Sequence, residues 1–316
     1  MIPVYKQLKA SRFGFGEGLI EMGKRNGNVV VIGADISSSV CVDMFAREFP
    51  QRFISLGIAE QNCVGVAAGL ALGGKIPVFS TYGVFAALRT TDQIRISLCY
   101  NNLHVIIGGA HAGISVGPDG ATHQALEDIA IMRSLPNMTV ISPCDATQAK
   151  LATIAAIEKI NGPVYIRFGR EPIPDFTGDN DAFEYGKAQL YNEGKDITVI
   201  ATGTMTWEAL LAASELKSYG IGVRVVNIHT IKPIDEEMII RAARETGKII
   251  TAEEHQIHGG MGSAVAEVVV RHCPVPMEFI GVNDHFGESG KPSELMNKYG
   301  LNAENIIQKI KLMLNK

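Results

Sequence analysis

Two histidines and an aspartate stand close together in one short segment, at His111, Asp119 and His123. The segment follows an apolar run, residues 105–108, and is punctuated by glycine and proline. A strand that ends in such a loop usually delivers side chains to the carboxyl edge of a parallel sheet, where α/β ligand sites form. Because histidine titrates near neutral pH, a pair of histidines can move protons or bind a sugar. The common alternative is a solvated connection, and the other motifs of the chain decide between the two.

Glu60 is a second candidate, because it directly precedes a segment rich in glycine and alanine, residues 64–73. One interpretation is a first-turn glutamate that the helix dipole favours. The other is that the small residues let the helix approach another backbone closely and bury Glu60. A buried carboxyl group can donate a proton to a ring nitrogen, or share one with it.

Phe79, Tyr82 and Phe85 recur at every third residue across the end of an expected strand and the turn that follows it. Aromatic residues at this spacing normally belong to a core. At the end of a strand they can also form an apolar wall around a flat heterocycle. Both interpretations are open at this point.

Arg12, Ser39 and Arg170 are far apart in the sequence, and each alone is explained by a surface salt bridge or a turn. Together they can form a phosphate pocket, because arginine offers a planar fork of donors and serine a hydroxyl group.

His255 and His258 suggest zinc, but their spacing is a weak signal and no third ligand stands nearby, so we predict no metal. Residues 259–262 begin a helix-like segment. Their glycines are explained either by binding of an anion at the start of the helix or by a tight turn. The five cysteines have neither metal-like nor redox-pair spacing, which predicts reduced, mostly buried thiols.

The composition predicts a globular protein of two domains rather than a nucleic-acid-binding protein or a membrane protein. With 316 residues, of which 46% are hydrophobic and 20% charged, the chain can fill the cores of two domains. Its net charge of -4 and the lack of a dense Lys/Arg block argue against a nucleic-acid partner. No apolar run approaches the roughly 18 residues of a membrane span, and residues 1–6 lack a signal or transit pattern. We therefore expect a cytoplasmic location.

Strand-like apolar runs alternate with helix-like segments through the first half of the chain, which predicts a parallel, doubly wound α/β sheet. Asp145 is expected to cap one of these helices. The expected pairs, strand first, are 29–34 with 41–48, 77–81 with 84–98, 104–107 with 124–133 and 139–142 with 145–158, before a last strand at 164–168.

A second alternation follows a stretch of linker composition, which contains Pro172, Pro174 and Gly178. It predicts a second, smaller α/β domain. The expected strands are 197–200, 223–226, 248–251 and 279–282, and a final helix is expected at 305–314.

The order of these motifs resembles the carboxyl-terminal part of transketolases, which are thiamine diphosphate enzymes, across essentially the whole chain. The resemblance is carried by Glu60 in Gly-Ile-Ala-Glu-Gln, the three aromatics, the Asp-Gly-Ala-Thr-His loop, Arg170 and the segment 253–264. It implies a thiamine pyrimidine-binding domain at 1–175, a linker at 176–190 and a transketolase carboxyl-terminal domain at 191–316.

The resemblance also implies a role for each candidate residue. Glu60 matches the glutamate that hydrogen-bonds the aminopyrimidine ring of the cofactor and so promotes formation of the ylid. The histidines match residues that contact the oxygen functions of the substrate and help proton transfers, and Asp119 matches the aspartate that reads the donor's α-hydroxyl. The remaining matches are Phe79, Tyr82 and Phe85 around the pyrimidine, Asp35 near the cofactor, and Arg12, Ser39 and Arg170 at the substrate phosphate.

Two departures from the family pattern are informative. The common form of the loop is Glu-Asp-Gly-Pro-Thr-His, whereas here Pro118 precedes the aspartate and Ala121 follows the glycine. The chain also lacks the Gly-Asp-Gly segment with a downstream asparagine through which thiamine enzymes hold Mg²⁺ and the diphosphate, and a diphosphate needs a divalent ion held by oxygen ligands. A separate amino-terminal subunit is therefore expected to carry the diphosphate and Mg²⁺ site.

The expected protein is the carboxyl-terminal subunit of a split transketolase, which transfers a two-carbon ketol unit from a ketose phosphate to an aldose phosphate, as in the pentose phosphate pathway. It is expected to act in a heterotetramer with two of each subunit. One alternative, 1-deoxyxylulose-5-phosphate synthase, is normally one long chain with its own diphosphate domain. Another, the β subunit of a 2-oxo acid dehydrogenase, usually lacks the Asp-Gly-x-Thr-His spacing, and pyruvate offers no hydroxyl for Asp119. A non-catalytic binding or regulatory subunit is a third, against which Glu60, His111 and His123 argue.

Overall fold

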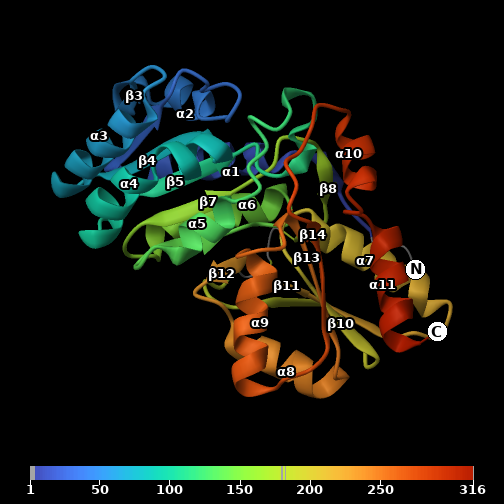
Figure 1. Ribbon diagram of the computed structural model, residues 1–316. Helices are drawn as coiled ribbons and strands as arrows, with labels where there is room; N and C mark the ends of the chain where they lie inside the picture. The colour runs from blue at the N-terminus through green and yellow to red at the C-terminus, as the bar shows by residue number, and fades with distance from the viewer. Residues whose placement is uncertain (1–3, 179–180, 182, 316) are drawn as a thin grey trace.

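The computed structural model describes residues 4–178, 181 and 183–315, which form two α/β units side by side (Figure 1). Residues 1–3, at the expected start of the first domain, lie outside the described residues. So do residues 179–180 and 182 of the expected linker, and residue 316.

The first unit is built on a seven-stranded sheet, parallel except for its edge strand β12. Most of its strands are buried throughout, as expected where helices cover both faces of a parallel sheet. In spatial order the strands are β12 (Thr230–Lys232), β6 (Thr139–Ile141), β7 (Val164–Arg167), β5 (Ile106–Ala110), β4 (Ile76–Tyr82), β2 (Val29–Gly33) and β3 (Phe53–Ser55).

Two apolar cores lie on the two faces of this sheet. One contains Phe15 of α1 and residues of α6, and the other contains Phe79 and residues of α3. Asp145 caps α6, as predicted, because its side chain accepts a hydrogen bond from the Gln148 N–H. The helices of this unit are α1 (Ser11–Arg25), α2 (Asp43–Glu48), α3 (Glu60–Leu72), α4 (Thr91–Gln93), α5 (Asp128–Ser134) and α6 (Ala146–Glu158), with a 3₁₀ turn η1 (Pro50–Arg52).

The second unit is built on a five-stranded sheet, parallel except for its edge strand β9. The spatial order of its strands is β14 (Met277–Val282), β13 (Ile249–Gln256), β10 (Ile197–Ala201), β11 (Val223–Asn227) and β9 (Gln189–Asn192). The helices around it are α7 (Met205–Lys217), α8 (Glu236–Thr246), α9 (Met261–His272), α10 (Pro292–Lys298) and α11 (Ala303–Leu314). The predicted α/β fold with two doubly wound units is confirmed.

Three features differ from the sequence expectations. The expected helix at 84–98 is instead two π-helical segments, η2 (Phe85–Arg89) and η3 (Ile94–Tyr100), with α4 between them. The helix expected from residue 124 begins at Asp128, because the preceding residues pair with other loops. Strand β12 follows the second unit's β11 in sequence but completes the first sheet, so the two units share part of their framework. A small antiparallel ribbon of β1 (Gln7–Lys9) and β8 (Ile173–Asp175) lies beside them.

The carboxyl ends of β2, β4 and β5 meet at one edge of the seven-stranded sheet, because these three parallel strands are neighbours. Asp35 follows β2, Tyr82 ends β4 and His111 follows β5. Candidate residues that are far apart in the sequence therefore arrive at one place. Among the described residues, no helix is both long and apolar enough to cross a lipid bilayer.

Candidate active site

Two aromatic residues and the two loop histidines form one cluster of rings at this edge. Tyr82 stacks on His111 with ring centroids 4.5 Å apart and an interplanar angle of 16°. Phe85 lies 5.9 Å from Tyr82 and 5.4 Å from His123, measured between ring centroids. The tertiary structure thus brings together side chains that the sequence places on a strand end, a turn and a loop.

Phe79 does not join this cluster. It is fully buried in the core that contains α3, whereas Tyr82 packs against the core on the opposite face of the sheet. Side chains alternate between the faces of a strand, so residues three apart point to opposite sides. The aromatic wall suggested by the sequence therefore consists of Tyr82 and Phe85, and Phe79 is a core residue beneath it.

Arg12 and Ser39 lie against the ring cluster. Arg12 Nη1 donates to the Ser39 carbonyl oxygen at 2.9 Å and lies 3.4 Å from His111 Nε2. The Ser39 hydroxyl is 3.0 Å from the Tyr82 hydroxyl. An arginine donor and the Ser39 carbonyl oxygen therefore lie at the buried imidazole, and the serine hydroxyl lies at the neighbouring tyrosine.

Arg170 reaches the same loop from the end of β7. Its Nη1 donates to Asp119 Oδ2 at 3.1 Å and to the Val116 carbonyl oxygen at 3.2 Å. Both Asp119 and Arg170 keep part of their side chains in solvent. The loop thus presents a carboxylate and a guanidinium side by side, and both are accessible to a ligand.

His111 is held as a neutral imidazole. Burial lowers its pKa to about 4, and the positive charges of Arg12 and Arg170 act in the same direction. Its backbone is left-handed, with φ of 52°, and its buried Nδ1 has no hydrogen-bond partner among the described residues. A neutral imidazole with one unpartnered nitrogen is suited to accept or donate a proton at a bound substrate.

Glu60 begins α3 and is buried, with 3% of its surface exposed. Arg89 Nη1 donates to both of its carboxylate oxygens, at 2.8 and 2.9 Å. The Arg89 guanidinium in turn lies over the Phe85 ring, 4.1 Å from its centroid. The carboxylate, the guanidinium and the aromatic wall are therefore one connected unit.

Arg89 was not among the residues singled out from the sequence. The available signal was its position four residues after Phe85, a spacing at which side chains meet on a helix.

Two further candidates lie at the rim of the site. Asp35 follows β2 with a left-handed φ of 64° and an exposed side chain. His123 is half-buried, and its Nδ1 lies 2.9 Å from the Thr122 hydroxyl.

The two features of the second unit that suggested ligands have internal explanations. His255 is fully buried, with Nδ1 2.7 Å from the Gln256 carbonyl oxygen and Nε2 accepting the Ala130 N–H at 3.4 Å. The glycine-rich start of α9 does bind an anion, which is the carboxylate of Glu253: it accepts the Met261 and Gly262 N–H groups at 2.7 and 2.8 Å.

Comparison with known families agrees with this geometry. Residues 8–174 match the model of the transketolase pyrimidine-binding domain, and residues 186–306 match that of the transketolase C-terminal domain. This chain belongs to the transketolase family. Its relatives are therefore thiamine diphosphate-dependent enzymes, and the edge that carries Glu60 is that of the family's pyrimidine-binding domain.

Subunits of split transketolases match this transketolase-family chain over nearly its whole length. It is 44% identical to the "6-deoxy-6-sulfo-D-fructose transketolase subunit SqwH" of Clostridium sp. (strain MSTE9), covering 92% of this chain and 90% of the relative. It is 46% identical to a "Putative transketolase C-terminal section" of Methanocaldococcus jannaschii, covering 98% of each. The solved "Split gene transketolase, inactive beta4 tetramer" superposes with a TM-score of 0.91 at 48% identity, covering 97% of this chain and 98% of that one.

The residues present fit the pyrimidine half of thiamine diphosphate. An aminopyrimidine needs a flat apolar wall and a carboxyl group in reach of its ring nitrogen. Tyr82 and Phe85 offer such a wall, and Glu60 offers a buried carboxylate that is joined to it through Arg89.

Proposed function

We propose that this chain is the carboxyl-terminal subunit of a thiamine diphosphate-dependent transketolase, which moves a two-carbon ketol unit from a ketose phosphate to an aldose phosphate. The observation that carries the proposal is the convergence of Glu60, the Tyr82–Phe85 wall and His111 on one sheet edge. Around it lie donors for a phosphate and an acceptor for a hydroxyl group.

Glu60 is assigned the cofactor contact. When bound, thiamine diphosphate supplies the nucleophilic carbon and the electron sink for cleavage of a carbon–carbon bond. The Glu60 carboxyl group would hold the pyrimidine through a hydrogen bond to a ring nitrogen and would support proton transfer there. Tyr82 and Phe85 pack around the ring and exclude water from it, and Asp35 lies at the neighbouring strand end.

The substrate contacts are assigned to the loop and to the two arginines. Neutral His111, together with His123, binds the oxygen functions of the sugar and takes or returns their protons. Asp119 accepts a hydrogen bond from the α-hydroxyl of the donor. Arg12, Ser39 and Arg170 hold the phosphate, since guanidinium groups and a hydroxyl match its oxygens.

The other half of the site is assigned to an amino-terminal subunit that holds the diphosphate and Mg²⁺. In the part of the chain that the structure describes, no three His, Cys, Asp or Glu side chains gather as metal ligands. Beside Glu60, moreover, α3 and the π-helical segments carry several exposed apolar and glycine residues among their exposed polar ones, and we assign the partner contact to them. These residues are Gly65, Gly69, Leu72, Leu88, Ile96 and Tyr100.

The proposed assembly contains two copies of each subunit. The need for a second kind of subunit is in line with the solved relative, whose title describes a β4 tetramer as inactive. The sugar pair is a separate question, because the Clostridium relative is named for a sulfonated fructose and Pro118 and Ala121 change the loop next to Asp119. Among the alternatives, a 2-oxo acid dehydrogenase β subunit is disfavoured because pyruvate gives Asp119 no hydroxyl to bind.

The test is co-expression with an amino-terminal subunit that carries Gly-Asp-Gly and the downstream asparagine. We expect turnover of ketose phosphates by the complex and none by the purified single chain. In the complex, Glu60→Ala should lower kcat by about 10²–10⁴-fold, the range of general acid–base contributions. Glu48→Ala, at a partly exposed glutamate paired with Lys24, is the matched control and should leave activity unchanged. Turnover by the single chain would refute the split site, and full activity of Glu60→Ala would remove Glu60 from catalysis.

A further inference from the structure

We propose that Glu254, in the second unit, is a positioning residue that fixes the loop carrying His111 and Asp119, so that the carboxyl-terminal domain sets the affinity for the sugar phosphate. The consequence for affinity rests on the proposed function. The consequence for the loop itself stands on geometry alone.

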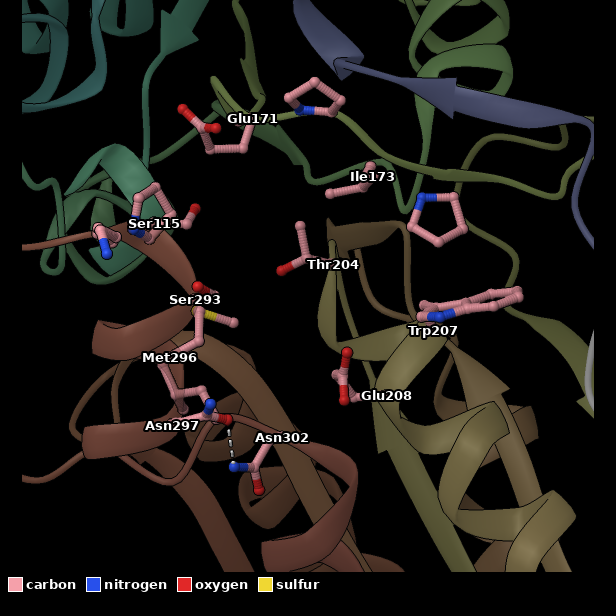
Figure 2. A pocket seen from close by; sticks show the side chains of 16 residues that line it. Ser115, Glu171, Ile173, Thr204, Trp207, Glu208, Ser293, Met296, Asn297 and Asn302 are labelled. Carbon is pink, nitrogen blue, oxygen red and sulfur yellow. Dashed lines mark hydrogen bonds between the residues drawn. The ribbon is translucent and has the colours of Figure 1, made fainter.

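The Glu254 carboxylate bridges the two units. It lies on β13, with 4% of the residue exposed. Oε1 accepts the Ser115 N–H at 2.6 Å, and Oε2 accepts the Thr204 hydroxyl at 3.0 Å. Ser115 belongs to the loop of the first unit, and Thr204 directly precedes α7 of the second. Figure 2 shows Ser115 and Thr204 on the wall of the cavity between the units, which has a volume of about 560 Å³.

The Ser115 N–H donates to Glu254, while the backbone before it is held by other groups: Gly113 N–H donates to the Ala125 carbonyl oxygen at 2.9 Å, and Gln124 Nε2 donates to the Ile114 carbonyl oxygen at 3.0 Å. Residues Ile114–Asp119 form a 3₁₀ segment, η4, that is interrupted by non-helical angles at Gly117. The Ser115 N–H lies in its first turn, where helical amides have no partner within the helix. Because Ser115 is buried, loss of the Glu254 acceptor would leave this donor without a partner in the interior.

The backbone is also shaped around the carboxylate. Gly113 has φ of +89°, and a Cβ at this position would clash with Glu254 Oε1. The loop and the carboxylate are therefore in direct contact, with no room for a side chain between them.

The backbone of Glu254 is also held from the first unit. Arg167 Nη2 donates to the Glu254 backbone oxygen at 2.8 Å, and Arg167 Nε donates to Asp128. Burial alone would lower the pKa of Arg167, but the negative charges of Asp128 and Glu254 outweigh this effect and raise it. Glu254 is thus fixed at its backbone oxygen as well as at its carboxylate.

Ser115 lies midway between the two residues that the loop presents. His111 is four residues before it, and Asp119 is four residues after it. Arg170 holds the second part of the loop through hydrogen bonds to Val116 and Asp119. If Ser115 is released, the segment that joins the imidazole to the carboxylate loses one of its anchors, and we expect the sugar phosphate to be held less tightly.

The adjacent residue, Glu253, provides a matched control. It is equally buried, and its carboxylate also accepts two hydrogen bonds, but both come from the α9 N-terminus within its own unit. Glu253→Ala should therefore destabilise the chain without loosening the loop. Glu254→Gln is the conservative variant, because its amide oxygen still accepts the Ser115 N–H.

The first measurement is hydrogen–deuterium exchange in the purified chain, which needs no activity. Glu254→Ala should raise the exchange rate across residues 113–119 by about 10-fold, as loss of a charge-assisted hydrogen bond implies. Glu254→Gln should stay near wild type, and Glu253→Ala should leave this segment unchanged. If Glu254→Ala does not fold, Thr204→Val, which removes only the bond to Oε2, should still raise exchange in the same segment.

The second measurement uses the complex with the amino-terminal subunit and xylulose 5-phosphate as the donor. Glu254→Ala should raise the KM of the donor about 10-fold, with a smaller change in kcat and an unchanged Kd of thiamine diphosphate. Glu254→Gln should restore most of the loss. A merely structural role would instead lower stability and active fraction without moving KM.

The proposal is overturned if exchange of residues 113–119 is unchanged in both Glu254→Ala and Thr204→Val, or if Glu253→Ala raises KM as much as Glu254→Ala does. A wild-type complex without transketolase activity would refute the proposed function. The exchange measurement would still decide whether Glu254 fixes the loop.

Discussion

Arg89 holds Glu60 through a single nitrogen, Nη1, which donates to both carboxylate oxygens at 2.8 and 2.9 Å. The two residues come from different helical segments, and 44% of the arginine side chain is exposed while the glutamate is buried. The same guanidinium stacks on Phe85. The pair therefore fixes the direction of the carboxylate relative to the aromatic wall.

Replacement of Arg89 should cost stability through Glu60. In Arg89→Met the buried carboxylate loses its charged donor, and the free energy of unfolding should fall by about 1–3 kcal/mol. In a chain that already carries Glu60→Gln, Arg89→Met should lower the free energy of unfolding much less, because the neutral amide leaves no buried charge unpaired. Urea unfolding of the four variants in this double-mutant cycle gives the coupling energy. Arg95→Met, at an exposed arginine of η3, is the control; additive effects of Arg89→Met and Glu60→Gln would contradict the pairing.

The stability of the chain should fall as the pH drops below neutral, in part because of two buried histidines. Burial lowers the pKa values of His111 and His229 from 6.5 to about 4. Between these values the unfolded chain binds protons that the folded chain does not, so stability rises with pH through this window and is fully present above about 6.5. Each histidine adds a slope of up to about 1.4 kcal/mol per pH unit.

His111→Gln and His229→Gln should each remove the contribution of one histidine to the change of unfolding free energy with pH. This holds whatever the effect of the substitution on stability at neutral pH. Urea unfolding between pH 4.5 and 6.5 measures the slope for each variant. An unchanged slope in His111→Gln would mean that the imidazole is not held neutral in the folded chain.

Asp119 should discriminate donors in the assembled enzyme. Asp119→Ala removes both the acceptor for the α-hydroxyl and the partner of Arg170, and kcat/KM for a ketose phosphate should fall about 10–100-fold. Steady-state kinetics of the complex with xylulose 5-phosphate measure this loss. Asp43→Ala, which breaks a surface pair with Arg47, is the control. Equal kcat/KM values in Asp119→Ala and wild type would exclude recognition of the hydroxyl by this residue.

Asp128 should be among the most sensitive buried positions. It pairs with Arg167 Nε at 2.9 Å and accepts the Tyr165 hydroxyl at 2.8 Å, and all three side chains are buried. Asp128→Asn leaves the guanidinium unpaired and should lower the free energy of unfolding by about 3–5 kcal/mol. Tyr165→Phe removes one hydrogen bond and should cost about 1–2 kcal/mol. Denaturant titration compares them, and a larger loss in Tyr165→Phe would contradict the assigned role of the ion pair.

Local patterns in the sequence were sufficient for the α/β class and for many of the strands. The apolar runs at residues 29–34 and 104–107 are long and bounded by polar turns, so they predicted strands β2 and β5. His111 and Asp119 were singled out because a loop after a buried strand has a known place at a sheet edge, and their role stays a prediction. The cap at Asp145 was found because it depends on only three further residues.

The tertiary structure decided the contacts that no local pattern contains. The spacing of Phe79, Tyr82 and Phe85 suggested one aromatic wall. The pleat of β4 instead sends Phe79 into the core on the other face of the sheet. Arg89 meets Glu60, and Glu254 meets Ser115, only because the order of the strands and the docking of the two units bring distant segments together. Periodicity specifies which face of an element is apolar, whereas the partner of a buried charge depends on how those faces pack.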